Sequence, residues 1–344
     1  MNTVSVHASR SYEVLIGSGL LSSLGQHIRT MTKADRVCVV SDSNVWPLYG
    51  KTVTEALETA ELSVHTFVFP AGEESKNGQT YLALLSFLTD CGLTRSDCIV
   101  ALGGGVTGDL AGFAAATYLR GVPYIQVPTT LLAAVDSSVG GKTAIDLPGG
   151  KNLAGAFYQP ILVLCDTDTL NTLPTDIFRD GCAEVIKYGV LYDPELFSHL
   201  DAHGLDFDRE RVITRCVELK RDVVAEDEFD RGARMKLNLG HTFGHGVEAA
   251  SDYQLSHGKA VAIGIAMACR AFPGPDSLRI IHCLEKFGLP VTTHYSAETL
   301  LAYMYADKKR SGGTVSLIVP LEIGRCDIVP TPVEQLKSLI QAGL

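Results

Sequence analysis

The sequence has few of the features that mark secreted, membrane or nucleic-acid-binding proteins. Its nine cysteines are odd in number, scattered and never arranged as C-x-x-C, which argues against a disulfide framework and a thiolate zinc site. The longest apolar run, residues 260–268, is far too short to span a membrane. The first residues lack the basic start and apolar stretch of a signal peptide. We therefore expect a cytoplasmic protein with no membrane partner.

Positive charge is also scarce. Lys and Arg number 29 against 39 Asp and Glu, and the resulting net charge of −10 disfavours a nucleic-acid-binding surface. Against this background, several basic residues stand beside glycines or within helical motifs, where an anion-binding pocket is a better explanation than scattered surface lysines. They are Lys142, Lys151, Lys187, Lys220, Arg234 and the pair Lys308 and Lys309.

The first half of the chain alternates β-rich and helical segments. Helical stretches cover residues 79–89 and 109–117, and β-rich runs cover residues 36–40, 62–69, 98–102 and 124–127. Each β-rich run ends in turn or ligand-type residues, a pattern that predicts an open parallel sheet with its ligand crevice at the carboxyl ends of the strands.

Helical periodicity dominates from about Pro174 onward, through residues 212–224 and 240–271. Only residues 315–319 look like a further strand. At 344 residues the chain is long for a single core. We therefore predict an α/β protein with two domains: a Rossmann-like, parallel-sheet nucleotide domain at 1–170 and a mostly α-helical metal- and substrate-binding domain at 171–344.

A glycine-rich turn, GGGVTGD at 103–109, follows a β-rich run and opens a helix. Glycines let the backbone approach a phosphate, and a helix N-terminus offers unpaired N–H groups. The turn matches neither G-x-G-x-x-G nor the P-loop, and glycines that serve only a tight turn are the alternative. However, Gly72, Glu73 and Lys76 follow the preceding strand, and Thr129 and Thr130 follow the next. Ligand-type residues at three successive strand ends favour a bound dinucleotide.

Three histidines and one glutamate indicate a divalent metal site. His241 and His245 are four residues apart and so share a helix face, His257 follows, and Glu184 lies in an apolar helical context. Three His and Glu ligands with one open position are typical of a catalytic metal. Spacing alone favours His241 and His245 as joint ligands, and helix histidines paired only with protein neighbours are the alternative.

Five motifs, spread over roughly residues 70–320, carry a resemblance to a known family. They are residues 103–109, residues 128–144 (PTTLLAAVDSSVGGKTA), residues 151–157 (KNLAGAF), residues 183–187 (AEVIK) and residues 237–245 (LNLGHTFGH). Present together and in this order, they closely resemble the 3-dehydroquinate synthases of the sugar-phosphate cyclase superfamily.

The resemblance implies a carbon–oxygen lyase of the shikimate pathway, which leads to chorismate and the aromatic amino acids. Such an enzyme converts 3-deoxy-D-arabino-heptulosonate 7-phosphate to 3-dehydroquinate and phosphate. NAD+ oxidises a secondary hydroxyl, phosphate is eliminated, the ketone is reduced again, and an intramolecular aldol step closes the ring. The implied cofactors are NAD+ and Zn2+ or Co2+.

The resemblance also assigns roles to residues. It makes Glu184, His241 and His257 the metal ligands and moves His245 to a substrate-contacting, proton-transferring role. It implies cofactor contacts by Gly72, Glu73, Lys76, Gly104, Gly105, Val106, Asp109, Thr129, Thr130, Asp136, Lys142 and Lys151. Catalytic or substrate contacts are implied for Lys142, Asn152, Lys187, Lys220, Arg234, Asn238 and one of Lys308 and Lys309. Arg120 resembles a phosphate-binding arginine that reaches a neighbouring subunit, which implies a homodimer.

The sequence departs from the family at Lys259, where glutamate is common, and at residues 271–275, whose prolines predict a helix end near Arg270. Three alternative functions remain. A sister cyclase would act on sedoheptulose 7-phosphate or glucose 6-phosphate, although Arg234, Asn238 and His245 favour a substrate with a carboxylate. A metal-dependent polyol dehydrogenase would not need so many cations, and a non-catalytic nucleotide sensor would not need the metal ligands.

Overall fold

The computed structural model describes residues 1–308 and 313–344. The chain forms two compact units, one made of residues 1–173 and 209–229 and the other of residues 174–208 and 230–344. The chain first passes from one unit to the other after residue 173, close to the expected boundary near residue 170. The sequence prediction placed residues 209–229 in the second domain, whereas the helix α7 (Arg209–Glu226) packs with the first unit.

The first unit contains a seven-stranded sheet in the order β1-β2-β9-β6-β5-β3-β4. Its strands are parallel except for the antiparallel pair β1 and β2. The strands are β1 (Asn2–Val6), β2 (Tyr12–Gly17), β3 (Arg36–Asp42), β4 (Ser63–Phe69), β5 (Cys98–Gly103), β6 (Tyr124–Pro128) and β9 (Leu162–Asp166). A separate hairpin joins β7 (Lys142–Leu147) and β8 (Gly150–Phe157).

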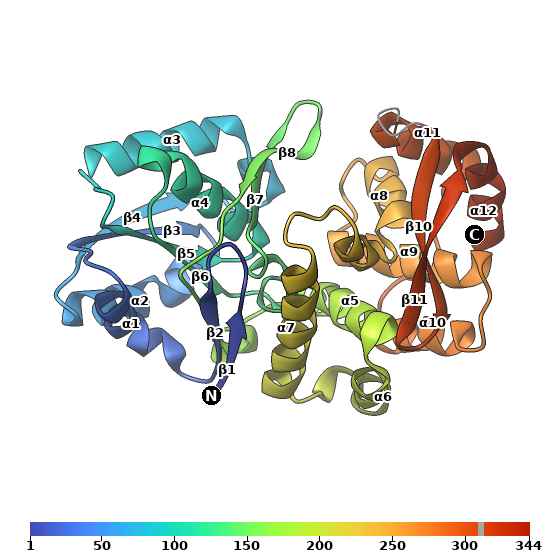
Figure 1. Cartoon of the computed structure of the whole chain (residues 1–344), viewed down its shortest axis with the longest axis horizontal. Coiled ribbons are helices and arrows are strands. Elements are labelled where there is room, and N and C mark those ends of the chain that lie inside the picture. The colour runs from blue at the N-terminus through green and yellow to red at the C-terminus, as the bar shows by residue number, and fades with distance from the viewer. Residues whose placement is uncertain (309–312) are drawn as a thin grey trace. The chain divides into compact units, whose positions relative to one another are not determined.

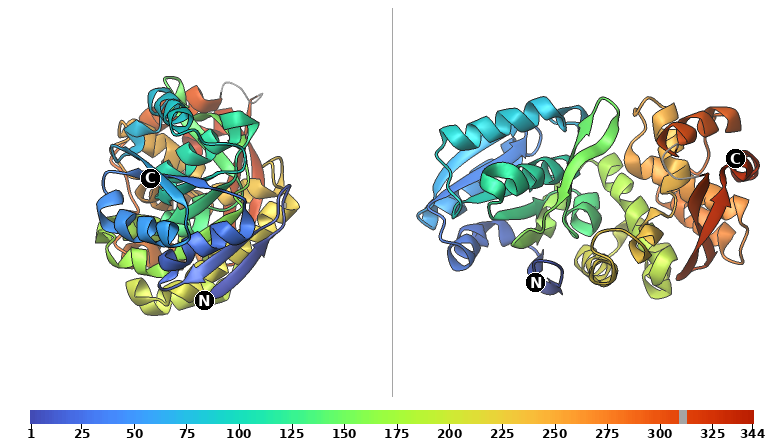
Figure 2. Two further views of the ribbon diagram at one scale, coloured as in Figure 1. Left: turned by 90° about the vertical axis from the view of Figure 1, so that its left-hand side faces the viewer. Right: turned by 45° about the horizontal axis from the view of Figure 1, so that its top comes forward.

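Helices cover both faces of this sheet (Figures 1 and 2). Because successive side chains of a strand point to opposite faces, Val37 and Val39 of β3 pack on one side and Cys38 and Val40 on the other. The first side is covered by α1 (Leu24–Met31) and α2 (Trp46–Thr59), and the second by α3 (Gly78–Asp90) and α4 (Gly105–Thr117). The predicted α/β class with a parallel sheet is confirmed.

The direction in which successive strands are added to the sheet reverses at β3, because β4 lies on one side of it and β5 on the other. In open parallel sheets, ligands bind at such a switch point, beyond the carboxyl ends of the strands. β3 ends at Asp42 and β5 at Gly103, so the glycine-rich turn lies at the expected edge.

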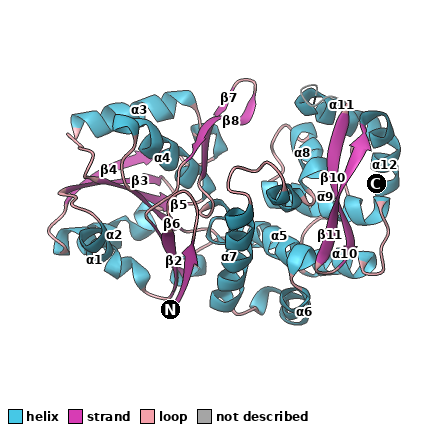
Figure 3. Ribbon diagram, in the orientation of Figure 1, coloured by secondary structure: helices cyan, strands magenta, loops and turns pink. Residues whose placement is uncertain are grey.

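The second unit is mostly helical, with one two-stranded sheet (Figure 3). Its helices are α5 (Thr175–Tyr192), α6 (Pro194–His203), α8 (His241–Ala250), α9 (His257–Ala271), α10 (Ser277–Lys286), α11 (Ala297–Lys308) and α12 (Leu336–Gly343), and its strands are β10 (Thr314–Glu322) and β11 (Arg325–Pro332). Among the helices of the described residues, none combines the length and hydropathy needed to cross a membrane.

The helix α9 forms the centre of the second unit. It packs against α5, α8, α10 and α12, and it is buried almost continuously from Ala260 to Cys269. A helix that is apolar on all sides is stable only inside a core. α9 ends at Ala271, as the proline-rich segment after it predicts, and its first residue is His257. The apolar run therefore fixes the position of a candidate metal ligand.

The cysteines are all free thiols, and eight of the nine are buried. This agrees with the absence of a disulfide pattern in the sequence.

Candidate metal centre and nucleotide-binding edge

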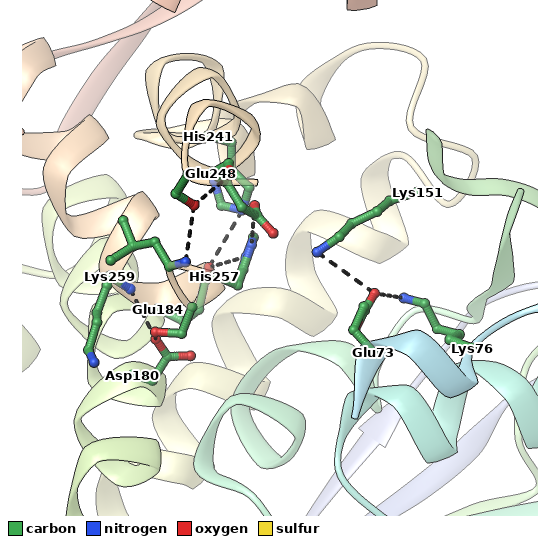
Figure 4. Close-up of polar contacts among 12 residues, drawn as sticks. Glu73, Lys76, Lys151, Asp180, Glu184, His241, Glu248, His257 and Lys259 are labelled. Carbon is green, nitrogen blue, oxygen red and sulfur yellow. Dashed lines mark hydrogen bonds and ion pairs between the residues drawn. The ribbon is translucent and has the colours of Figure 1, made fainter. Parts of the chain in front are cut away.

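Three helices of the second unit bring Glu184, His241 and His257 together. Glu184 lies in the middle of α5, and the histidines are the first residues of α8 and α9. The Oε1 atom of Glu184 lies 3.5 Å from Nε2 of His241 and 3.4 Å from Nε2 of His257 (Figure 4). One ligand atom from each residue lies within 4.8 Å of the others. A fully buried carboxylate facing two imidazole nitrogens is a donor set that fits a divalent metal.

Glycines allow the three helices to approach so closely. A Cβ atom on Gly264 of α9 would lie 1.9 Å from the carbonyl oxygen of Gly240, at the start of α8. A Cβ atom on Gly258 would lie 2.0 Å from the carbonyl oxygen of Asp180 on α5. At these positions the backbones of neighbouring helices are in direct contact, and any side chain would push the metal ligands apart.

The start of α9 is fixed by Asp180, one helical turn before Glu184 on α5. Its Oδ1 accepts hydrogen bonds from Ser256 Oγ at 2.5 Å and from the backbone N–H of Lys259 at 3.0 Å. A carboxylate at a helix N-terminus is stabilising because it pairs with unsatisfied N–H groups. This contact uses the backbone of Lys259, so it is independent of the side chain at that position.

The two candidate histidine ligands have opposite pKa shifts. Burial, together with the nearby Lys187 cation, lowers the pKa of His241 to about 3, which keeps its imidazole neutral. Burial also acts to lower the pKa of His257, but Glu184 and Glu248 outweigh it and raise that pKa to about 10. Because a metal binds only neutral imidazole, a metal held at this candidate site would displace the proton of His257.

Lys187 and Glu184 form a buried ion pair on α5. The lysine lies three residues after the glutamate, so both side chains are on one helix face. Arg234 and Asn238 lie in a 3-10 turn, Ala233–Asn238, directly before α8; Arg234 is buried and Asn238 exposed. Lys308 ends α11, but its side chain and all of Lys309 lie outside the described residues.

The structure does not group His241 and His245 as joint ligands with Glu184, as spacing alone favoured. His245 is exposed on α8, with its ring centroid 5.5 Å from that of His241. Helical spacing places the two histidines on one face, but His257 at the start of α9 lies closer to the carboxylate of Glu184. His245 instead belongs to a second group, with Glu248 and His257.

The sequence reasoning missed Glu248. This buried carboxylate on α8 has its Oε2 atom 3.7 Å from Nδ1 of His257. It stands seven residues after His241 and three after His245, and these intervals place all three on one helix face. That spacing could have identified it.

In the first unit, the glycine-rich turn is very tight. β5 ends at Gly103 and α4 begins at Gly105, with Gly104 between them. A Cβ atom on Gly103 would lie 2.3 Å from Oγ1 of Thr107, so the turn excludes a side chain there. Thr129 donates its backbone N–H to the carbonyl oxygen of Gly103 at 3.0 Å. The structure thus joins this turn to Thr129 and Thr130, and Val106 lies in the first turn of α4.

Lys76 lies at the centre of a charged cluster. Its Nζ atom lies 2.8 Å from Glu73 Oε1, 3.3 Å from Asp109 Oδ2 and 3.9 Å from Asp146 Oδ1, while Lys151 Nζ lies 4.0 Å from Glu73 Oε1 (Figure 4). Burial, partly offset by Lys76, raises the pKa of Asp109 to about 6. Asp146 was not predicted, because its strand was not recognised in the sequence.

The remaining predicted residues of the first unit lie in several other places. Lys220 of α7 is buried and contacts the side chain and backbone oxygen of Asp136. Lys142, at the start of β7, is exposed, and the backbone N–H of Asn152 donates to Asp146 at 2.7 Å. Arg120 is exposed after α4 with a left-handed φ of 67°, and Gly72 has a φ of 121°.

Comparisons with known proteins identify the family of this chain. The N-terminal model of 3-dehydroquinate synthase matches residues 66–180, and the C-terminal model matches residues 181–310. A 3-dehydroquinate synthase from Pelobacter propionicus is 48% identical over 347 residues and covers 96% of each chain. Another, from Caulobacter vibrioides, is 46% identical over 336 residues, covering 92% of this chain and 91% of that one. The chain belongs to the 3-dehydroquinate synthase family.

Solved structures place this family member among the sugar-phosphate cyclases. A 2-deoxy-scyllo-inosose synthase complexed with carbaglucose-6-phosphate, NAD+ and Co2+ has a TM-score of 0.90, with 28% identity and full coverage of both chains. The 2-epi-5-epi-valiolone synthase of Streptomyces hygroscopicus, with NAD+ and Zn2+ bound, has a TM-score of 0.88 and 26% identity, covering 99% of this chain and 98% of that one. A glycerol dehydrogenase from Schizosaccharomyces pombe, 18% identical, shares the fold alone.

Proposed function

We propose that this chain is a metal- and NAD-dependent enzyme that converts 3-deoxy-D-arabino-heptulosonate 7-phosphate to 3-dehydroquinate and phosphate. The observation that carries the proposal is the group formed by Glu184, His241 and His257, in a chain that matches 3-dehydroquinate synthases over nearly its whole length. Relatives of this fold have been solved with NAD+ and either Co2+ or Zn2+. The same two cofactors are proposed here.

Glu184, His241 and His257 would hold the metal and leave a coordination position for substrate. A divalent ion there supplies a Lewis acid for the hydroxyl and carbonyl oxygens of the substrate. His245 lies one helical turn from His241 and is exposed, so its imidazole can take or relay the hydroxyl proton. Lys187 pairs with Glu184, which limits the negative charge of the buried carboxylate.

Residues of the first unit would bind NAD+. The turn at Gly104 and Gly105 and the N-terminus of α4 offer N–H groups to the diphosphate. Glu73, Lys76, Asp109 and Lys151 provide charged and hydrogen-bonding groups beside it, with Gly72, Val106, Thr129, Thr130 and Asp136 as further contacts. When bound there, NAD+ would supply a hydride acceptor for the oxidation and the same hydride for the later reduction, so the cofactor would not be consumed.

The substrate carries a carboxylate and a phosphate, which require cations. Lys187, Lys220 and Arg234 are each buried, and a desolvated cation attracts an anion more strongly than a hydrated one. Arg234 adds a planar fork that suits two oxygens at once. Lys142, Asn152 and Asn238 supply further polar contacts from exposed positions.

The proposed assembly is a homodimer in which Arg120 contacts phosphate in the site of the partner subunit. The exposed position of Arg120 and its left-handed backbone support this role, because unfavourable backbone conformations are retained most often where function requires them.

The test is an assay of phosphate release from zinc-loaded protein given NAD+ and 3-deoxy-D-arabino-heptulosonate 7-phosphate, with NADH absorbance followed in parallel. Catalytic release without NADH accumulation is expected. Release only from sedoheptulose 7-phosphate or glucose 6-phosphate would identify a sister cyclase. Accumulation of NADH with a simple polyol would identify a dehydrogenase.

A further inference from the structure

His257 has a carboxylate beside each of its ring nitrogens. Nε2 lies 3.4 Å from Glu184 Oε1, on the side where the metal ligands converge. Nδ1, the other ring nitrogen, lies 3.7 Å from Glu248 Oε2. The two carboxylates therefore face different nitrogens of the ring (Figure 4). Glu184 would share the metal with Nε2, and Glu248 faces the nitrogen that the metal would leave unused.

The other histidine ligand has an equivalent arrangement. His241 Nδ1 lies 3.1 Å from the carbonyl oxygen of Leu239. Since a carbonyl oxygen only accepts hydrogen bonds, Nδ1 of the neutral ring carries the proton and Nε2 presents its lone pair toward Glu184. Metal-bound histidines commonly donate their second N–H to an oxygen acceptor in this way, which fixes both tautomer and ring orientation.

Glu248 is well placed to do the same for His257. It is 4% exposed, and its helix is held against α9 by a close backbone contact, since a Cβ on Gly244 would lie 2.7 Å from the carbonyl oxygen of Ala260. A carboxylate is costly to bury without a polar partner. The rigid contact between α8 and α9 holds Glu248 and His257 at a defined separation.

We propose that Glu248 is a positioning residue that accepts the Nδ1 proton of His257 and turns Nε2 toward the metal. The inference rests on the metal site of the proposed function and extends it by one residue that does not itself contact the metal. Glu248 and the carbonyl of Leu239 thus perform the same task for the two histidine ligands. Because it is charged, the carboxylate would also make the imidazole a stronger electron donor than the carbonyl does.

Metal binding by the purified full chain tests the proposal without relying on catalysis. Zn2+ affinity is measured by chelator competition, and the visible absorption of Co2+ reports on the geometry of its ligands. Glu248→Ala removes the acceptor, and Glu248→Gln keeps an oxygen but loses the charge. Glu285→Ala, at an exposed position of α10 in the same unit, is the matched control.

The expected loss of Zn2+ affinity is about 10- to 100-fold for Glu248→Ala and smaller, about threefold to tenfold, for Glu248→Gln. The Co2+ spectrum should change in the alanine variant and remain wild-type in the control. A glutamine variant that binds Zn2+ as tightly as the wild type would overturn the proposal, whether or not the alanine variant folds.

Stoichiometry separates this inference from the function on which it rests. Two Zn2+ ions per wild-type chain, with one lost in Glu248→Ala, would make Glu248 a ligand of the group with His245 and would overturn the positioning role. A wild-type chain that binds no Zn2+ would overturn both this inference and the proposed metal dependence. One ion per chain, bound more weakly in the Glu248 variants, supports the proposal.

Discussion

Glu184 is a carboxylate without solvent contact, and one ammonium group and two imidazoles converge on it. Removing one partner of a buried ion pair costs more free energy than the pair contributes, because the remaining charge then has neither water nor a partner. Substitutions at this cluster should therefore affect metal binding and stability together. Controls at exposed positions of the same unit are needed to separate the two effects.

His257→Ala should abolish metal binding and activity together. Loss of a ligand should exceed the effect expected from loss of a supporting residue, so we expect the affinity for Zn2+ to fall by more than about 100-fold. Metal content after dialysis and phosphate release are the measurements, and His282→Ala, an exposed histidine of α10, is the control. A variant that kept its full zinc content would remove His257 from the ligand set.

Lys142→Ala should weaken substrate binding but leave the fold intact. Lys142 is exposed at the start of β7, so the substitution leaves no cavity, and loss of one charged hydrogen bond of about 1.5–3 kcal/mol should lower kcat/KM by about 10- to 100-fold. Steady-state kinetics and a thermal melt measure the two effects. Lys51→Ala on α2 is the control, and near-normal turnover in Lys142→Ala would make Lys142 an ordinary surface lysine.

Asp109 should make stability depend on pH. The pKa of Asp109 in the folded chain, about 6, lies above the ordinary value of 3.8. Its contribution to the free energy of unfolding is therefore complete below pH 3.8 and is lost as the pH rises through 6. Relative to Asp109→Asn, the wild type should lose up to about 2 kcal/mol of unfolding free energy between pH 4 and 7. Denaturant titrations of both proteins give this difference. A wild type that gained stability over the same interval would show that Lys76 lowers the pKa instead.

Single residues were predictable where they followed a recognisable spacing. The glycine-rich turn and the group of Glu184, His241 and His257 were found, since both depend on short motifs or on family resemblance. Asp146 was missed because its role depends on the hairpin of β7 and β8, which was not recognised in the sequence, and because Asp146 lies between two of the motifs rather than in one. Its partner Lys76 lies far away in the sequence, and only the folded chain shows the pair.

The contact between α8 and α9 makes the geometry of the metal centre a property of two helices. Gly240, Gly244 and Gly264 all lie on it, and a side chain at any of them would meet backbone or helix side chains of the neighbouring element. Because each helix begins with a candidate ligand, a small displacement at this contact would be transmitted to both imidazoles.

Gly264→Ala should therefore destabilise the chain and weaken metal binding. The new methyl group would overlap the carbonyl oxygen of Gly240, and overpacking of this kind typically costs about 1–3 kcal/mol. Thermal melts and Zn2+ affinity measure the effect. Gly78→Ala, where nothing lies within 4 Å of the added atom, is the control. Unchanged Zn2+ affinity in Gly264→Ala would show that the helices can separate without moving the ligands.

Some elements were predicted from a continued period, and others were missed, among them β9, β1 and β2. β3, β4, β5 and β6 were found because each is an apolar run followed by turn residues. β11 was missed because it contains Pro330 and Pro332, which argue against a strand. Residues 240–271 were predicted as one helical region, but the helical conformation is interrupted at Asp252 and Tyr253, which both have positive φ angles. The turn-forming residues in this segment could have predicted the interruption.

For the whole molecule, the proposed homodimer predicts complementation between two inactive variants. Arg120→Ala and His257→Ala chains, unfolded and refolded together, should regain about a quarter of wild-type activity, since half of the dimers are mixed and one of their two sites is intact. Light scattering establishes the dimer, and each variant refolded alone is the control. If Arg120 served the site of its own chain, mixing would restore nothing.

The return of α7 to the first unit has a consequence for synthesis. Residues 1–173 leave the ribosome first, but the contact between Lys220 and Asp136 cannot form until α7 has followed. By then, residues 174–208 of the second unit are already exposed without their remaining partners. The two units must therefore mature together rather than in succession, and exchange of a whole unit between related genes would require three junctions instead of one.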